Sequence, residues 1–287
     1  MSESDLQSRL ELANSIAKSA GLLTLNYFQT DRFDVIKKGD GSPLTIADQE
    51  SEKHLRAAIQ QSFPNDAIVG EEFGNTDGDS GFCWILDPID GTKSFISGVP
   101  LYGTMVAVEK VADQSESVES GCEKTGERRS VIGSVYFPGL DIGIYAAQGQ
   151  GAWSFKADEA PVRARVSQKT ELSDSVLVTS AVEMFARRDA AEVYQQLSES
   201  VYFCRTWGDV YGYYLVATGR VELMIDPMLN IWDAAAVQPI IVEAGGVFSD
   251  WDGVNRIDAG EAIGSNGLVH PAVIEITRKF AGVFPSA

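Results

Sequence analysis

The sequence predicts an α/β protein built in two successive parts, and three patterns support this fold class. Apolar residues repeat at helical spacing near the start of the chain, short β-forming runs follow between 67 and 166, and strands alternate with helices from about residue 175. The change of rhythm puts the boundary within 165–175. We therefore expect an N-terminal α+β domain over 1–170 and a C-terminal α/β domain over 171–287, in keeping with the length of the chain.

Two helices are predicted to open the chain. The first is indicated by apolar residues at helical spacing, namely Leu6, Leu10, Ala13, Ala17 and Ala20. A polar stretch over 37–43 separates it from a second helix, which begins near Thr45 and stops before Phe63. This second helix turns Leu55 and Ile59 inward.

Short runs rich in β-branched and aromatic residues then predict strands. In the first part they are Ala67–Gly70, Cys83–Leu86, Tyr102–Val111, Val131–Phe137, Asp141–Ala147 and Val162–Val166. In the second part strands are predicted at Val176–Ser180, Val201–Cys204, Val221–Ile225, Val247–Asp250 and Ala262–Ser265, with helices near Arg187–Ser198, Asp209–Thr218, Asp233–Ala244 and from His270 onwards. The segment Asp113–Ser130 has few apolar residues, so an exposed loop is expected there.

Acidic residues dominate the charge balance, and this limits what the protein can bind. The chain has 23 Lys plus Arg against 41 Asp plus Glu, a formal charge of −18. Such a field repels nucleic-acid phosphates and anionic lipids, so neither nucleic acid nor a membrane is an expected partner. A phosphate-bearing substrate would need a divalent metal ion to reverse the local sign of the charge.

Cysteine use and the N-terminal residues favour a reducing, cytoplasmic location. Cys83, Cys122 and Cys204 are scattered without a CxxC pair and are interpreted as reduced thiols. Charged residues occur from Glu3 to Lys18, so no signal peptide is predicted, and no apolar run reaches the roughly 18 residues of a membrane helix. An organelle reached with a transit peptide that has since been removed is the alternative.

The stretch 84–95 holds the strongest candidate for a site. An apolar strand ends at Asp87, the next residue is a proline that withholds a ladder hydrogen bond, and Asp90 follows on a tight turn. Gly91 permits close backbone approach, and a helix starting near Thr92 would point free N–H groups at an anion. Two carboxylates facing such groups suit a divalent cation beside a phosphate, although an Asp-Gly turn with an N-cap gives the same pattern.

Two further acidic sites occur at element ends. Glu71 and Glu72 come directly after the strand Ala67–Gly70, and a solvated acidic turn is the alternative interpretation. Asp233 opens an apolar helix, where an aspartate also serves as an N-cap. Mg²⁺ prefers oxygen ligands and is commonly shared with substrate phosphate. The carboxylates that would build such a site are Glu71, Asp87, Asp90 and Asp233.

In combination, three blocks of the sequence resemble the inositol monophosphatase superfamily of metal-dependent phosphomonoesterases. They are Gly70-Glu71-Glu72, Asp87-Pro88-Ile89-Asp90-Gly91-Thr92, and Trp232-Asp233 with Ala244-Gly245-Gly246, in family order. The resemblance runs from about residue 5 to 282 and implies a five-layered αβαβα sandwich of the inositol monophosphatase and fructose-1,6-bisphosphatase type. It also implies Mg²⁺ as the cofactor, with two or three ions, together with lithium sensitivity and a homodimer.

The resemblance implies metal-binding roles for the matching residues. Glu71, Asp87 and the carbonyl of Ile89 look like the ligands of one Mg²⁺, and Asp87, Asp90 and Asp233 look like those of a second. Two ions about 3.5–4 Å apart can clamp the attacking and leaving oxygens of an in-line displacement. Glu71 is therefore expected to serve catalysis as well as metal binding.

The phosphate and the attacking water have implied partners too. Backbone N–H groups of Gly91 and Thr92 would hold the phosphate, and the Thr92 hydroxyl paired with Asp48 resembles the family's arrangement for activating water. Thr45 and Asp48 also form a capping-box pattern, which explains an acid at this position without catalysis. Lys38 matches a basic loop that borders the metal site in relatives, and an exposed turn lysine is the alternative.

Other enzyme classes lack their motifs in this chain. No GxxxxGK[ST] sequence is present, which disfavours a P-loop NTPase, and the segment 149–151 lacks the third glycine of a Rossmann fingerprint and is interpreted as a turn between strands. The histidines, His54 and His270, are near no acidic block or cysteine, which argues against a zinc site and a Ser–His hydrolase. A phosphatase-like scaffold that acts through a protein partner stays open.

Substrate choice is expected in the second half of the chain. Asp226 matches the place where inositol-specific relatives carry a glutamate that contacts ring hydroxyls, and Asp209 adds an acid where those relatives have a small neutral turn. The runs 92–98 and 226–240 look like the histidinol-phosphate phosphatase branch, whose substrate carries an ammonium and an imidazole that carboxylates attract. A helix N-cap is the alternative role for Asp209. Inositol 1-phosphate and 3′-phosphoadenosine 5′-phosphate are the other candidate substrates.

Overall fold

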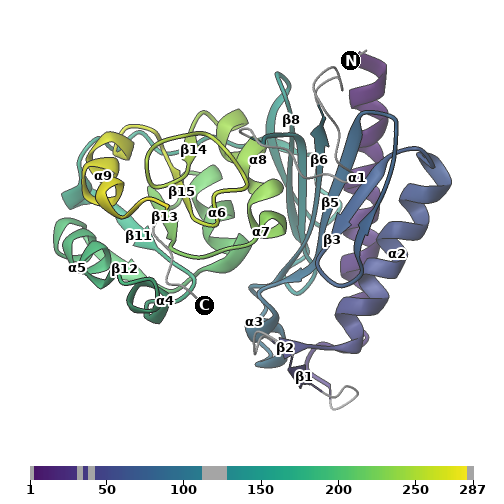
Figure 1. Cartoon of the computed structure of the whole chain (residues 1–287), viewed down its shortest axis with the longest axis horizontal. Helices are drawn as coiled ribbons and strands as arrows, with labels where there is room; N and C mark the ends of the chain where they lie inside the picture. Colours follow the sequence, from purple (N-terminus) through teal and green to yellow (C-terminus); the bar gives the residue numbers. More distant parts are fainter. Residues whose placement is uncertain (1–2, 31–34, 38–42, 112–127, 283–287) are drawn as a thin grey trace.

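The computed structural model describes residues 3–30, 35–37, 43–111 and 128–282. They form five layers in the order helices, sheet, helices, sheet, helices (Figure 1). The αβαβα sandwich implied by the family resemblance is therefore confirmed. Lys38, Cys122 and most of the predicted loop 113–130 lie outside the described residues. The division into domains at residue 170 stays a prediction.

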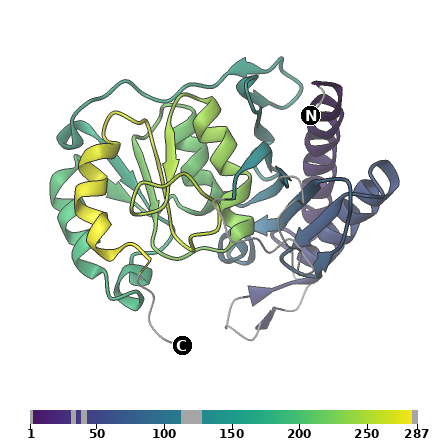
Figure 2. The same cartoon turned by 45° about the horizontal axis from the view of Figure 1, so that its top comes forward.

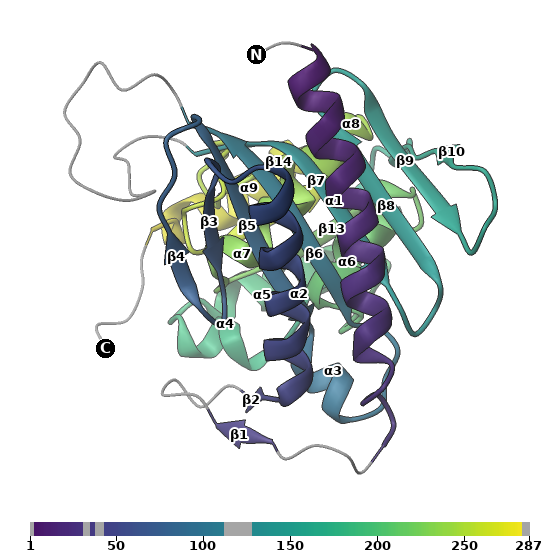
Figure 3. The ribbon, with the colours of Figure 1, turned by 90° about the vertical axis from the view of Figure 1, so that its right-hand side faces the viewer.

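Two helices lie side by side on the outer face of the first sheet (Figure 3). α1 (Glu3–Thr24) buries the whole apolar stripe that its periodicity predicts. α2 (Ile46–Ser62) begins after Thr45, whose hydroxyl accepts a hydrogen bond from the Ala47 N–H at 3.2 Å, and it ends before Phe63 as predicted. Burial of this stripe against the sheet, rather than helix propensity, holds both helices in place.

The first sheet has eight strands in the order β10-β9-β8-β7-β6-β5-β3-β4. They are β3 (Ala67–Gly70), β4 (Gly74–Thr76), β5 (Phe82–Asp90), β6 (Gly103–Lys110), β7 (Ser130–Phe137), β8 (Ile142–Ala147), β9 (Gly151–Lys156) and β10 (Val162–Arg163). β3 and β5 run parallel, and the other neighbours run antiparallel. The sequence does not predict β4 or β9. β4 is a polar Gly-Asn-Thr run that becomes a strand by pairing with β3, and β9 starts within the turn predicted at 149–151.

The second sheet is smaller and mixed. Its five strands have the order β12-β11-β13-β15-β14. They are β11 (Val176–Val178), β12 (Phe203–Arg205), β13 (Leu223–Asp226), β14 (Val247–Ser249) and β15 (Ala262–Ser265). β11 runs parallel to both β12 and β13, whereas β15 is antiparallel to β13 and β14. A separate two-stranded sheet pairs β1 (Ile36–Lys37) with β2 (Pro43–Leu44).

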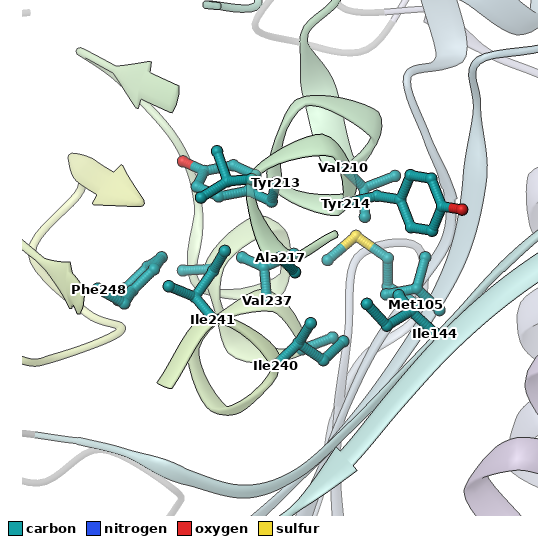
Figure 4. Packing of buried hydrophobic residues seen from close by; sticks show 14 of the residues in the cluster. Met105, Ile144, Val210, Tyr213, Tyr214, Ala217, Val237, Ile240, Ile241 and Phe248 are labelled. Atoms are coloured by element: carbon teal, nitrogen blue, oxygen red, sulfur yellow. The ribbon is translucent and has the colours of Figure 1, made fainter. Parts of the chain in front are cut away.

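Three helices fill the layer between the sheets: α6 (Asp209–Ala217), α7 (Ile231–Ala235) and α8 (Val237–Glu243). Figure 4 shows apolar side chains of α6 and α8 meeting Met105 and Ile144 of the first sheet and Phe248 of the second. Sequence periodicity predicts a single helix over 233–244, and this is wrong, because the chain forms two helices that meet at Ala236. The shared core fixes the two sheets relative to each other, which the site requires.

The last layer covers the outer face of the second sheet (Figure 2). It contains α4 (Glu183–Arg187), α5 (Ala191–Ser200) and α9 (His270–Thr277), with short 3₁₀ turns at Leu172–Asp174 and Arg278–Phe280. The single helix predicted over 187–198 is wrong at its start. The chain breaks before α5 because Asp189 adopts a left-handed conformation with φ of 59°.

The described part of the chain has neither a helix suited to a membrane nor a disulfide bond. None of its helices is long and apolar enough to cross a bilayer. Cys83 in β5 and Cys204 in β12 are free thiols, as predicted for these two cysteines.

Candidate active site

A break in the register of β5 brings two carboxylates together. Successive side chains of a regular strand alternate between faces, so residues three positions apart point to opposite sides. Between Asp87 and Asp90 the pairing with β6 shifts, in the manner of a β-bulge, and Asp90 then pairs with Gly103. The register pairs neither Pro88 nor Ile89 with β6, as expected for a proline that withholds a ladder hydrogen bond, and pairing resumes at Asp90. The irregularity lets both aspartates contribute to one cluster.

A third carboxylate arrives from the middle helical layer. Asp233 lies in the first turn of α7, where its Oδ2 accepts the Asn230 N–H at 2.6 Å in a capping box. The predicted N-cap chemistry is therefore present, with Asn230 as the N-cap itself. One carboxylate oxygen each from Asp87, Asp90 and Asp233 lies within 4.8 Å of the other two. Asp233 therefore takes part in the capping box of α7 and belongs to the carboxylate cluster at the same time.

The electrostatics of the cluster disfavour three negative charges. Burial raises the pKa of Asp87 well above its ordinary value, and the neighbouring charges of Glu71, Asp90 and Asp233 raise it further. Burial, followed by the charges of Asp209 and Asp233, does the same to the pKa of Asp90. The pKa of Asp233 is raised to about 7, mainly by burial. A cation would relieve this repulsion and restore the ionised forms.

Glu71 stands at the edge of this cluster. It follows β3 directly, and its N–H donates to the Leu86 carbonyl of β5 at 3.2 Å. Its charge contributes to the raised pKa values of Asp48, Asp87 and Asp233, so its carboxylate faces the same space. The prediction that acids from two neighbouring strand ends meet here is consistent with this geometry.

Asp48 is buried beside the cluster, with 1% of its surface exposed. Its Oδ2 accepts hydrogen bonds from the Thr45 N–H at 2.8 Å and the Thr45 hydroxyl at 2.6 Å, so the capping box exists. Its Oδ1 is buried and has no hydrogen-bond partner among the described residues. Burial raises the Asp48 pKa to about 6. An orphaned buried carboxylate oxygen is costly, and a bound water or ion would satisfy it.

Thr92 does not pair with Asp48 in this structure. It opens α3 (Thr92–Ile96), and its hydroxyl donates to the Ile89 carbonyl at 3.1 Å. The predicted Thr92–Asp48 contact is thus replaced by Thr92–Ile89 and Thr45–Asp48 contacts. The Ile89 carbonyl keeps a second lone pair, since a carbonyl oxygen accepts in two directions.

Gly91 links the two halves of the site. Its φ of 84° is left-handed, a conformation that glycine adopts at little cost. A Cβ placed on Gly91 would lie 3.0 Å from Oδ2 of Asp209, so a side chain here would also crowd the first residue of α6. The next residue, Val210, donates its N–H to Asp90. The amino end of α6 therefore touches both residues of the Asp90-Gly91 turn.

Asp209 and Asp226 share Ser180, a residue that sequence reasoning does not single out. The Asp209 N–H donates to the Ser180 hydroxyl at 2.8 Å, and the Ser180 N–H donates to Asp226 at 3.2 Å. The Tyr213 hydroxyl donates to the other Asp226 oxygen at 3.1 Å. Burial raises the pKa of Asp209, and it raises the pKa of Asp226 to about 6. No sequence signal marks Ser180 or Tyr213, because their partners are distant in the chain.

The chemistry of these donors fits a hard divalent cation. Carboxylates and a backbone carbonyl are the ligands that Mg²⁺ and similar ions take. The fit rests on two observations: three carboxylate oxygens converge, and a buried oxygen of Asp48 lacks a partner.

A layered α/β fold with converging carboxylates at a strand end is typical of metal-dependent hydrolases. The comparisons make the class specific. Residues 5–280 match the model of the Inositol monophosphatase family, and the chain belongs to this family. The expectation of a phosphatase-class enzyme is thereby confirmed at the level of the family.

Named relatives cover nearly the whole chain. The chain is 39% identical over 254 residues to a histidinol-phosphatase of Chlorobaculum parvum, covering 88% of this chain and 90% of the relative. It is 34% identical over 282 residues to a histidinol-phosphatase of Mycobacterium tuberculosis, covering 98% and 100%. Among solved structures, the extragenic suppressor protein SuhB of Bartonella henselae superposes with a TM-score of 0.81 at 25% identity, over 95% of this chain and 99% of that one.

Proposed function

We propose that this protein is a Mg²⁺-dependent phosphomonoesterase that hydrolyses histidinol phosphate, or a closely similar cationic phosphate ester, to the free alcohol. One observation carries the proposal: the convergent cluster of Asp87, Asp90 and Asp233 lies next to a second acidic pair, Asp209 and Asp226. The first group suits metal ions, and the second suits a positively charged leaving group. The 39% identity to a histidinol-phosphatase supports the same choice.

The metal ligands follow from the donor set. Glu71, Asp87 and the Ile89 carbonyl would hold one Mg²⁺, and Asp87, Asp90 and Asp233 a second. Bound Mg²⁺ supplies Lewis-acid polarisation of phosphoryl oxygens and an acidified water. The cluster's own repulsion makes metal binding favourable and couples it to proton release, because the ligating carboxylates must be ionised.

The protein supplies binding and proton transfer. Backbone N–H groups of Gly91 and Thr92 would hold the phosphate oxygens, since Gly91 carries no side chain to block them. Asp48 would accept a proton from the attacking water at its unpartnered Oδ1. A pKa near 6 keeps Asp48 mostly ionised at pH 7 and still basic enough to serve. The Thr92 hydroxyl, which donates to the Ile89 carbonyl, would accept a hydrogen bond from this water and help to orient it.

The substrate preference would arise at Asp209 and Asp226. Asp209 is half-buried at the start of α6, so it is the carboxylate that would touch an ammonium or imidazolium group directly. Asp226 is buried and already accepts two hydrogen bonds, so it would act through its charge and by holding Ser180 in place. Inositol 1-phosphate, which offers neutral hydroxyls, would gain little from either charge.

The test compares two esters in two proteins. We expect wild type to hydrolyse histidinol phosphate with a much higher kcat/KM than inositol 1-phosphate. A hydrogen bond to a charged group contributes on the order of 1.5–3 kcal/mol, so Asp209→Asn should lower kcat/KM for histidinol phosphate about ten- to a hundredfold, mainly through KM. The inositol ester should change far less.

A surface change serves as the control. Asp252→Asn removes an exposed carboxylate that pairs with Arg278 at 3.0 Å and should alter neither ester. Wild-type preference for inositol 1-phosphate, or equal losses for both esters in Asp209→Asn, would transfer the proposal to an inositol-phosphatase. Preference for 3′-phosphoadenosine 5′-phosphate would overturn both. No phosphate release from any ester with Mg²⁺ present would favour the scaffold alternative.

We further propose a cytoplasmic homodimer, in keeping with the family resemblance. Sedimentation equilibrium of the full chain measures the assembly, and a single species at 31.0 kDa would contradict it.

A further inference from the structure

Glu52 lies buried beneath the turn that carries Glu71. It is in α2, has no exposed surface, and points both carboxylate oxygens at the loop between β3 and β4. Its Oε2 accepts the Glu72 N–H at 2.7 Å, and its Oε1 accepts the Phe73 N–H at 3.2 Å. Because these donors belong to the two residues after Glu71, the carboxylate fixes the backbone immediately downstream of a proposed metal ligand.

Arg56 completes this contact one helical turn later. Its Nε donates to Glu52 Oε1 at 2.7 Å, so the buried charge is paired. Its Nη1 donates to the Thr76 hydroxyl at 3.0 Å, and its Nη2 donates to the Gly74 carbonyl. The Nε side of the guanidinium therefore pairs with Glu52, while its two Nη groups contact the first and last residues of β4.

Gly70 makes the approach sterically feasible. A Cβ placed on this residue would lie 2.1 Å from Glu52 Oε1 and 2.6 Å from Arg56 Nη2, closer than any real contact. The glycine before Glu71 is thus needed for the Glu52–Arg56 pair to reach the loop backbone. The packing of Glu52 and Arg56 therefore explains why a glycine stands at position 70, before the two glutamates.

Glu71 is consequently held from two sides. Upstream, its own N–H donates to the Leu86 carbonyl at 3.2 Å and ties it to β5, the strand that carries Asp87. Downstream, Glu52 holds the next two N–H groups. A metal site demands ligand placement within about 0.5 Å, and groups that orient ligands typically change metal affinity 10- to 100-fold when removed.

We propose that Glu52, supported by Arg56, is a positioning residue that fixes the Glu71 carboxylate for metal binding. The proposal rests on the proposed function, which makes Glu71 a ligand. Glu52 is not itself a ligand, because both of its oxygens accept hydrogen bonds within the protein. Its charge matters as well as its shape: an amide in its place would offer one oxygen to the three donors and turn its NH₂ group toward the others.

The experiment measures metal binding without turnover. The full chain is freed of metal and titrated with Mg²⁺ by calorimetry at pH 7.5, and thermal unfolding is recorded for each variant. We expect Glu52→Gln to weaken the tightest Mg²⁺ site about tenfold or more, approaching the loss in Glu71→Gln. Arg56→Lys, which keeps the charge pair but loses the forked contacts to Gly74 and Thr76, should weaken it about threefold.

Glu222→Gln is the matched control. Glu222 is also a buried glutamate that accepts a backbone N–H, from Val176 at 2.8 Å, and pairs with a cation, Lys169 at 3.3 Å, but it stands at the opposite end of β13 from Asp226. It should lose thermal stability without losing Mg²⁺ affinity.

The outcomes distinguish a failure of the positioning role from a failure of the proposed function on which it rests. Wild-type Mg²⁺ affinity in folded Glu52→Gln would overturn the positioning role, as would equal losses of affinity in Glu52→Gln and Glu222→Gln. If Glu52→Gln does not fold, unchanged affinity in Arg56→Lys overturns the proposal. Failure of wild type to bind Mg²⁺ at all, or unchanged affinity in Glu71→Gln, would instead contradict the metal site of the proposed function.

Discussion

The cluster of Asp87, Asp90 and Asp233 and the carboxylate of Asp226 are neighbouring acidic regions with different surroundings. Asp226 accepts hydrogen bonds from the Ser180 N–H and the Tyr213 hydroxyl, one to each oxygen. Asp87, Asp90 and Asp233 each accept a backbone N–H too, but they also bring an oxygen each to within 4.8 Å of one another. The two donors partly offset the burial that raises the pKa of Asp226 to about 6, whereas the carboxylates of the second group also repel one another, and a cation or proton would relieve that repulsion. The contrast matches the two roles of the proposed function, a charge that attracts substrate and a site that binds metal.

Metal removal is the most severe way to test this contrast. Without Mg²⁺ the cluster lacks the charge that a phosphate group requires, so phosphate release in excess chelator should fall to the buffer background. Restoring Mg²⁺ should restore the rate. Full-rate hydrolysis by metal-free protein would show that the cluster needs no cation, and the comparison would fail.

A single amide tests the cluster next. Asp90→Asn keeps the shape and the contact with the Val210 N–H but removes a ligand charge. We expect kcat/KM to fall at least roughly a hundredfold, because metal-ion stabilisation of the transition state is worth several kcal/mol. Steady-state phosphate release at saturating Mg²⁺ measures it. Near-normal turnover would remove Asp90 from the ligand set.

The pH dependence of stability sharpens the comparison in the metal-free protein. The pKa values of Asp226 and Asp233 rise from 3.8 in the unfolded chain to about 6 and about 7 in the fold. The folded state therefore binds protons more tightly, and its stability should fall as pH increases between about 4 and 7, at up to roughly 1.4 kcal/mol per unit for each group.

Thermal unfolding with and without Mg²⁺ checks this prediction. In chelator, Tm at pH 5.5 should exceed Tm at pH 8 by several degrees. Added Mg²⁺ should raise Tm more at pH 8, where protons no longer compete for the carboxylates. A metal-free Tm that increases steadily with pH would contradict the raised pKa values.

The smallest expected effect probes the hydrogen-bonded side of the comparison. Tyr213→Phe removes the hydroxyl that donates to Asp226 and leaves the packing of the ring against Phe248. One hydrogen bond contributes about 1 kcal/mol, so KM for histidinol phosphate should rise about fivefold with kcat little changed. Mg²⁺ affinity should stay at the wild-type value. A larger effect on Mg²⁺ affinity than on KM would show that Asp226 acts as part of the metal site, and the distinction between the two acidic regions would fail.

Periodicity and turn chemistry predict much of the fold. The Ala67–Gly70 and Ala262–Ser265 strands have the predicted bounds, and the last helix begins at His270 as expected. These elements have local signals: an apolar run, a glycine, a change of period. The splits before α5 and within 233–244 have weaker signals, because a left-handed Asp189 and a helix junction at Ala236 leave the apolar pattern unbroken.

The candidate site was predictable in its residues but not in its contacts. Strand ends and acidic pairs point to Asp87 and Asp90, yet the shift in register that gathers them depends on pairing with β6, which the sequence does not reveal. The roles of Ser180 and Glu52 depend on partners far away in the chain. At the Asp87–Asp90 bulge the failure of a local rule coincides with the candidate site, which is a common pattern in proteins.

The helix α7 lies late in the sequence, and this position has a consequence for folding during synthesis. Domains fold from the N-terminus as the ribosome releases them. The first sheet and its Asp87–Asp90 bulge can form early, but Val210 and Asp233 follow much later in the chain and belong to the middle helical layer. A nascent or truncated chain would therefore lack one ligand of the proposed metal site and the N–H group that contacts another. If the proposed ligand set is correct, the metal site forms only after most of the polypeptide has been synthesised.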